Sequence, residues 1–302
     1  MSERRIEIVE VAPRDGLQNE QVLISTAHKI ELIERMVAAG ARRIEVTSFV
    51  RPDRVPQLAD AEAVIAGLSL PGGVVTIGLV MNMKGALRAL ETQVKELGAV
   101  CVATDSFAKR NQGQTSLESA EMAADVVRFA RSEGRRAQVT IGASFGCPFE
   151  GEVSADHVVE LAKRIAEADP VEIALADTIG VAVPVQVHAL VSRVREAIGT
   201  IPVRVHLHNT RNTGIANAWA AIEAGAATLD ASVGGIGGCP FAPAATGNIA
   251  TEDLLYMLDR SGVASGYDLG RAIETAHWLA QVMGTALPAL VSRAGPFPTP
   301  KA

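Results

Sequence analysis

The chain has 302 residues, of which 48% are hydrophobic and 21% are charged, so it is long enough to bury a large core. Its formal net charge of -6 argues against a broad nucleic-acid-binding surface, and no apolar stretch reaches the roughly 20 residues that span a membrane. The first apolar run, from Ile6, is too short for a secretion signal and the three cysteines argue against a disulfide framework, so we expect a cytoplasmic protein.

Short runs rich in β-branched residues recur along the chain and alternate with amphipathic segments. They predict strands at Ile6–Val11, Arg43–Ser48, Val75–Met81, Ala99–Thr104, Gln138–Ser144, Val171–Asp177, Val203–His208 and Thr228–Val233. The segments between them predict helices at Ala27–Ala39, Leu117–Ser132, Ala155–Ala168 and Val185–Ile198. Glycines at positions typical of helix C-termini follow several of these segments, namely Gly40, Gly134 and Gly225.

The alternation predicts an α/β fold, a TIM (β/α)8 barrel with extra C-terminal helices. Eight strand–helix units without a glycine-rich dinucleotide turn after the first strand favour a closed barrel over a doubly wound sheet. We expect one domain over residues 1–302, with the barrel at about 5–262 and the helical extension at about 263–292.

Polar residues collect where the predicted strands end, which is where barrel enzymes place their catalytic groups. His206 and His208 lie two residues apart in a strand, so both imidazoles should face the barrel mouth. Oxygen ligands from Asp15 and Asn248 would complete a mixed site that suits Mg²⁺ or Mn²⁺. The structural alternative is two inward-facing histidines that are hydrogen-bonded in the core.

Four further residues are candidates for catalysis. Glu45 would be costly to bury alone in an apolar strand, so we expect it to pair with Arg14. Asp177 either takes part in the chemistry or caps the turn that follows it. Cys239 lies among glycines that allow a close backbone approach to a ligand, whereas Cys101 and Cys147 are expected to be structural.

Five stretches together resemble the 3-hydroxy-3-methylglutaryl-CoA lyase family. They extend from residue 9 to residue 258 and read VEVAPRDGLQNE, EVTSFVRPDRVPQLAD, FGCPFEG, ADTIGV and SVGGIGGCPFAPAATGNIATEDLLYML. The last of them, a glycine-rich cysteine loop, is the most specific. The PRDG turn and the HxH pair also occur in isopropylmalate synthase and hydroxy-oxovalerate aldolase relatives.

The resemblance implies a metal-dependent lyase that cleaves 3-hydroxy-3-methylglutaryl-CoA, or a close 3-hydroxyacyl-CoA, to acetyl-CoA and a keto acid such as acetoacetate. It implies Mg²⁺ or Mn²⁺ ligands at Asp15, His206, His208 and Asn248. Arg14 would stabilise the enolate, Cys239 would be a mobile catalytic thiol, and Glu45 and Asp177 would support them. Ser48 and Asn111 are our candidates for cofactor binding. The expected partner is an acyl-CoA substrate, and a homo-oligomer stays open.

The chain departs from the family at several positions. After His208 it reads Asn209-Thr210-Arg211-Asn212-Thr213, where the family has HDT followed by Tyr-Gly-Gln. It also reads Gln138-Val139-Thr140 where an Arg-Gly-Tyr run is typical, and Ala174 where serine is usual. Because of these changes, substrates with other acyl groups are alternatives, such as a citramalyl-CoA-like or 3-substituted glutaryl-CoA thioester. A hydroxy-oxo-acid aldolase, an acyl-CoA condensing synthase and a barrel without activity are the remaining alternatives.

Overall fold

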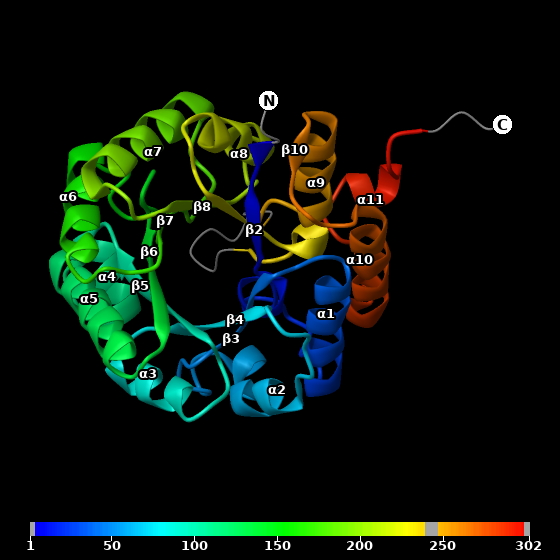
Figure 1. The fold of residues 1–302 in the computed structure, drawn as a ribbon, viewed down its shortest axis with the longest axis horizontal. Helices are drawn as coiled ribbons and strands as arrows, with labels where there is room; N and C mark the ends of the chain where they lie inside the picture. Colours follow the sequence, from blue (N-terminus) through cyan, green and yellow to red (C-terminus); the bar gives the residue numbers. More distant parts are fainter. Residues whose placement is uncertain (1–3, 239–246, 299–302) are drawn as a thin grey trace.

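Eight parallel strands close into a barrel in the computed structural model, which describes residues 4–238 and 247–298. Each strand pairs with its neighbours in sequence order, and the last pairs with the first. Figure 1 shows the helices as a ring outside this barrel, so the predicted TIM barrel is confirmed. The strands are β2 (Glu7–Glu10), β3 (Arg43–Ser48), β4 (Val75–Val80), β5 (Glu96–Val102), β6 (Arg136–Gly142), β7 (Ile173–Asp177), β8 (Val203–Leu207) and β9 (Thr228–Ala231).

The predicted strands are all present, but two of them begin earlier than expected. β5 starts at Glu96 and β6 at Arg136, charged residues that an apolar pattern does not assign to a buried strand. They are accommodated because Glu96 accepts hydrogen bonds from Arg136, at 2.9 Å, and from Arg43 on β3, at 2.6 Å. Ion pairing inside the barrel therefore extends strands that hydrophobicity alone would shorten.

The helices follow the strands in turn, and the four predicted ones are confirmed. They are α1 (Thr26–Ala38), α2 (Ala61–Gly67), α3 (Met83–Leu90), α4 (Asp105–Gln112), α5 (Ser116–Ser132), α6 (Ala155–Ala166), α7 (Pro184–Ile198), α8 (Gly214–Glu223) and α9 (Thr251–Arg260). After α1 the chain turns at Gly40, which has φ +118° and lies so close to Gly266 that a Cβ there would be 2.4 Å from its carbonyl oxygen.

The C-terminal part adds α10 (Leu269–Met283) and α11 (Val291–Ala294), and α10 packs against α1. A short parallel pair, β1 (Arg4–Arg5) with β10 (Val263–Ala264), joins this part to the start of the chain. No sequence pattern predicted this pair, because two-residue strands are too short to show a period.

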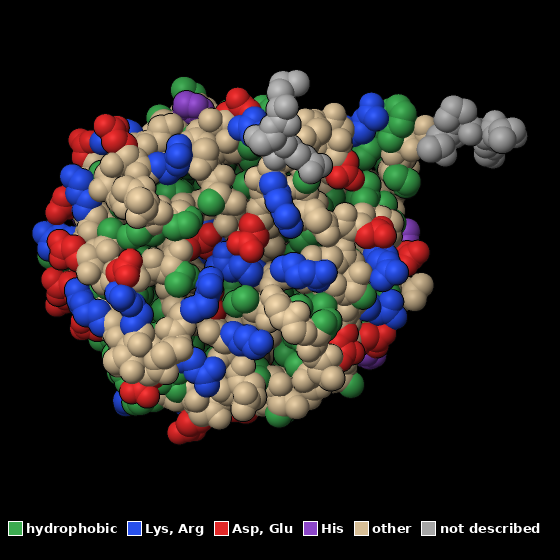
Figure 2. All heavy atoms as spheres, viewed as in Figure 1, with side chains coloured by type: hydrophobic (Ala, Val, Ile, Leu, Met, Phe, Trp, Pro, Cys, Tyr) green, Lys and Arg blue, Asp and Glu red, His purple; other side chains and the backbone are tan. Residues whose placement is uncertain are grey.

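The described residues form three apolar clusters. A large one fills the layer between strands and helices, a small one, Val9, Val11 and Ile77, lies inside the barrel, and another includes Phe107 of α4 and Cys147. On the face shown in Figure 2, acidic and basic side chains are mixed, with several lysines and arginines near its centre. Among the described residues, none of the helices has the length and apolarity that a membrane crossing needs.

Candidate active site

The segment after β2 forms a single helical turn, Ala12–Gly16, that carries Arg14 and Asp15. Glu10 anchors it: one carboxylate oxygen accepts hydrogen bonds from the backbone N–H groups of Ala12 and Val233, both at 2.9 Å. The turn is thereby tied to the segment after β9. Complete burial raises the pKa of Glu10 to about 7, although these hydrogen bonds partly oppose the effect.

Arg14 is clamped between two carboxylates, so the expected pairing with Glu45 is confirmed. Its Nε and Nη2 atoms lie 2.8 and 2.6 Å from Glu45 Oε2, and its Nη1 lies 2.7 Å from Asp15 Oδ1. Burial raises the pKa of Glu45 despite Arg14. Burial also raises that of Asp15, but Arg14, His206 and His208 outweigh it and hold the pKa of Asp15 well below its usual range. Asp15 is therefore an anion at neutral pH.

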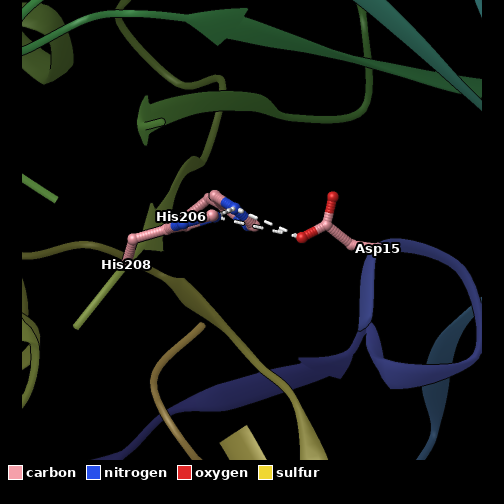
Figure 3. Close-up of side chains that lie close together, drawn as sticks. All are labelled: Asp15, His206 and His208. Carbon is pink, nitrogen blue, oxygen red and sulfur yellow. Dashed lines mark hydrogen bonds and ion pairs between the residues drawn. The ribbon is translucent and has the colours of Figure 1, made fainter. Parts of the chain in front are cut away.

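His206 and His208 face the same point as Asp15, as their spacing predicted (Figure 3). Their Nε2 atoms are 3.1 Å apart and lie 3.9 and 4.0 Å from Asp15 Oδ2. Burial and the charge of His206 lower the pKa of His208 to about 4, so His208 is neutral at pH 7. A neutral imidazole has the lone pair that a metal ion requires.

Asn248 lies beside the end of β8. It forms an isolated β-bridge with His208, and its side-chain Nδ2 donates a hydrogen bond to Asp15 Oδ2 at 2.8 Å. Its Oδ1 is buried and has no hydrogen-bond partner among the described residues. A buried oxygen without a donor is available as a ligand.

Asp15, His206 and His208 therefore form a possible metal site. One ligand atom from each lies within 4.8 Å of the others. A carboxylate and two imidazoles fit a divalent cation, because the negative charge and the lone pairs converge on one point, and Asn248 adjoins them through its contact with Asp15. The four predicted ligands are thus brought together by three segments far apart in the sequence.

Asp230 on β9 contacts the candidate site, and sequence reasoning did not single it out. Its Oδ2 lies 3.1 Å from His206 Nδ1, the ring nitrogen on the side away from Asp15. The signal was available, because Asp230 is the only acid within the predicted strand Thr228–Val233. An acid buried within a strand needs a polar partner, and the neighbouring strand offered His206.

Asp177 takes the capping role. Its two carboxylate oxygens accept the backbone N–H groups of Val181 and Ala182, at 2.9 and 3.0 Å. Burial raises the pKa of Asp177, and these hydrogen bonds partly offset the rise. The inward positions of β7 are the even-numbered ones, such as Ala174 beside Arg204, so Asp177 lies on the opposite face and its carboxylate serves the loop.

The other candidates are placed as follows. Ser48 is buried at the end of β3, where its hydroxyl accepts from Val50 N at 3.2 Å, and Asn111 is exposed on α4. Cys239 lies outside the described residues. Cys101 and Cys147 are buried, as expected, and burial raises the pKa of Cys101 to about 12.

The departures from the family fall into two places. Asn209 accepts from Gly214 N at the start of α8, and Arg211 donates to the carbonyls of Ile179 and Gly180, so both organise loops at the barrel mouth. Gln138 and Ala174 instead lie inside the barrel beside Arg204, below the site.

Comparison with known proteins agrees with this geometry. The profile of the family described as HMGL-like matches residues 5–279. The chain is 44% identical to the (R)-citramalyl-CoA lyase of Chloroflexus aurantiacus, over 96% of this chain and 95% of that protein. It is 37% identical to the mitochondrial hydroxymethylglutaryl-CoA lyase of Rattus norvegicus, over 96% and 90% of the two chains.

Solved structures give the same result. An HMG-CoA lyase from Acinetobacter baumannii, in complex with coenzyme A and 3-methylmalate, superposes with a TM-score of 0.94 and 38% identity, covering 99% of each chain. The hydroxymethylglutaryl-CoA lyase of Pseudomonas aeruginosa gives a TM-score of 0.92 with 36% identity, covering 96% and 97% of the two chains. The chain therefore belongs to the HMGL-like family, and it is an enzyme of the carbon–carbon lyase type.

Proposed function

We propose that this enzyme cleaves the C2–C3 bond of a 3-hydroxyacyl-CoA thioester with one divalent metal ion, Mg²⁺ or Mn²⁺. The observation that carries the proposal is the convergence of Asp15, His206 and His208 beside the clamped guanidinium of Arg14. The same end of the barrel is where this fold builds catalytic sites. Relatives named as CoA lyases, aligned over nearly the whole chain, support the thioester substrate over an aldolase substrate.

The residues divide the chemistry between them. The C3 hydroxyl must lose its proton as a ketone forms, and the thioester oxygen must hold the negative charge that develops. A metal held by Asp15, His206, His208 and Asn248 would lower the pKa of that hydroxyl. Arg14 would donate to the enolate oxygen, because a guanidinium has more N–H groups than the three contacts with Glu45 and Asp15 use.

Two acyl groups are candidates, and they differ by one methylene. Cleavage of 3-hydroxy-3-methylglutaryl-CoA gives acetyl-CoA and acetoacetate, whereas cleavage of citramalyl-CoA gives acetyl-CoA and pyruvate. The 44% identity to the citramalyl-CoA lyase, against 37% to the rat hydroxymethylglutaryl-CoA lyase, favours the shorter acyl group. The changes at Asn209 and Arg211, which organise the mouth loops, are in keeping with an altered acyl site.

A screen of 3-hydroxyacyl-CoA thioesters with Mg²⁺ or Mn²⁺, with products identified by mass spectrometry, tests this proposal. We expect (R)-citramalyl-CoA to have the highest kcat/KM and to yield pyruvate. A higher kcat/KM for 3-hydroxy-3-methylglutaryl-CoA would reassign the acyl group and keep the reaction. Cleavage of none of the thioesters, with metal present and the protein folded, would refute the proposed function.

Cys239 is our proposed acid for protonating the carbanion, on the basis of the family resemblance alone. Replacing it with serine keeps the size of the side chain and removes most of its acidity, so Cys239→Ser should lower kcat by about 10²–10⁴-fold, the usual contribution of a general acid. Steady-state kinetics measure this, with Cys147→Ser as the control at a buried cysteine. A wild-type kcat for Cys239→Ser would transfer the acid role to another group.

A further inference from the structure

The interior of the barrel directly below the site is charged. Such interiors are usually filled by branched apolar side chains. On β8 and at the residue just after it, the inward positions instead carry Arg204, His206 and His208 in alternation, and all three are buried. Arg204 therefore lies one layer below the two histidines, where the proposed chemistry has assigned no residue.

Asp230 lies between Arg204 and His206. β8 and β9 pair in the register Arg204 to Thr228, which places Asp230 beside His206 two residues further along. One oxygen of Asp230 is 3.1 Å from His206 Nδ1, and the other is 3.4 Å from Arg204 Nε. Asp230 is 4% exposed and Arg204 is 3% exposed, so both charges depend on each other for compensation.

Residues of β6 and of the β7 region hold Arg204 in this position. Its Nη2 donates to Gln138 Oε1 at 2.8 Å and to Thr140 Oγ1 at 3.2 Å, both on β6. Its Nε also lies 3.5 Å from Glu172 Oε2, just before β7. The neighbour in register on β7 is Ala174, whose methyl group takes little space beside the arginine. The position of Arg204 is thus fixed by hydrogen bonds to Gln138 and Thr140 and by the space beside Ala174.

We propose that Asp230 fixes His206 with its proton on Nδ1, so that Nε2 is free to accept a metal ion, and that Arg204 holds Asp230 in place. A carboxylate accepts hydrogen bonds only, so its partner nitrogen must carry the proton. Carboxylates that bind the far nitrogen of a histidine orient the ring and increase its basicity as a ligand. Asp230 and Arg204 are positioning residues, because they act through His206. The claim that His206 Nε2 binds a metal ion rests on the proposed function, whereas the claim that the proton lies on Nδ1 does not.

The first test compares Asp230, which contacts His206, with Glu96, a buried carboxylate at the other end of the barrel. In Asp230→Asn the amide can turn its NH₂ group towards Nδ1, which would move the proton to Nε2 and block the ligand atom. We expect calorimetric titration with Mn²⁺ alone to show an affinity about 10–100-fold below wild type. The control, Glu96→Gln, removes a carboxylate paired with Arg43 and Arg136 at the other end, and should keep the wild-type Mn²⁺ affinity. A folded Asp230→Asn variant with an Mn²⁺ affinity within about twofold of wild type would overturn the proposal.

The second test reads the tautomer directly and does not depend on a variant folding. Nitrogen NMR of the metal-free wild-type protein with ¹⁵N-labelled histidine, recorded at a pH at which His206 is neutral and assigned with the aid of His206→Gln, should show the His206 proton on Nδ1. A proton on Nε2 would refute the proposal whatever the variants do. If His206 is protonated on Nδ1 but the wild-type protein binds no Mn²⁺, the proposed function fails and the positioning by Asp230 stands.

Arg204 needs a separate test, because its removal also leaves the buried charge of Asp230 without a cationic partner. Arg204→Met should weaken Mn²⁺ binding by a smaller factor than Asp230→Asn, and Arg204→Lys, which keeps the charge, should recover part of the loss. In the Asp230→Asn background Arg204→Met should weaken Mn²⁺ binding no further, since both act through one contact. A full additional loss in the double variant would show that Arg204 does not act through Asp230.

Discussion

Replacing Arg14 with methionine is expected to lower kcat by about a hundredfold or more, which corresponds to about 2.7–4 kcal/mol of transition-state stabilisation. The guanidinium is fixed by Glu45 and Asp15 before substrate binds, so little reorganisation is needed when charge develops on the thioester oxygen. An interaction made mainly in the transition state affects kcat, and KM should therefore stay close to the wild-type value. Steady-state kinetics on the thioester with the highest kcat/KM measure both.

The control for Arg14→Met is Arg128→Met, which removes an exposed arginine paired with Asp125 on α5 and should leave kcat unchanged. Thermal unfolding separates a loss of stability from a loss of chemistry. Burial already raises the pKa of Glu45, so the loss of Arg14 favours a neutral Glu45 and limits the free-energy cost of a stranded charge. A raised KM with an unchanged kcat would make Arg14 a binding residue only.

The barrel could be predicted because its strands carry an apolar outer face. Ile44 and Val46 on β3 are buried between the strands and the helices, and similar pairs recur in each strand. The shorter helices α2, α3 and α4 were not identified, since seven or eight residues show too little of the 3.6-residue period.

The site could be predicted where one strand carries the pattern, as with His206 and His208. The pairing of Arg14 with Glu45 followed from the cost of an unpaired buried acid. Asp230 and Arg204 were missed because their contact depends on the register between β8 and β9. That register cannot be inferred from the sequence of either strand alone. Asp177 shows the converse limit: its position at a strand end indicated chemistry, but the parity of β7 directs it to the loop.

The second large effect is expected at His208, whose replacement with alanine should abolish metal-dependent turnover and leave the barrel folded. Its Nε2 lies 3.1 Å from His206 Nε2, and its Nδ1 has no hydrogen-bond partner among the described residues. Removing the imidazole therefore takes one hydrogen-bond partner from His206 Nε2 and disturbs no other hydrogen bond of the described side chains, so the loss of stability should be modest. The loss of a ligand, by contrast, removes one of the few groups that can hold the ion.

Thermal unfolding with and without Mn²⁺ distinguishes these two consequences. A ligand present at 100 times its Kd stabilises the folded state by about 2.7 kcal/mol, so Mn²⁺ should raise the Tm of the wild-type protein clearly. The Tm of His208→Ala should respond little at the same concentration, while His188→Ala, at an exposed histidine on α7, should respond as the wild type does. Because His208 is neutral at pH 7, the missing response cannot come from the loss of a charge. If His208→Ala keeps both the Mn²⁺-induced rise in Tm and normal turnover, the ion is held elsewhere and the proposed ligand set is wrong.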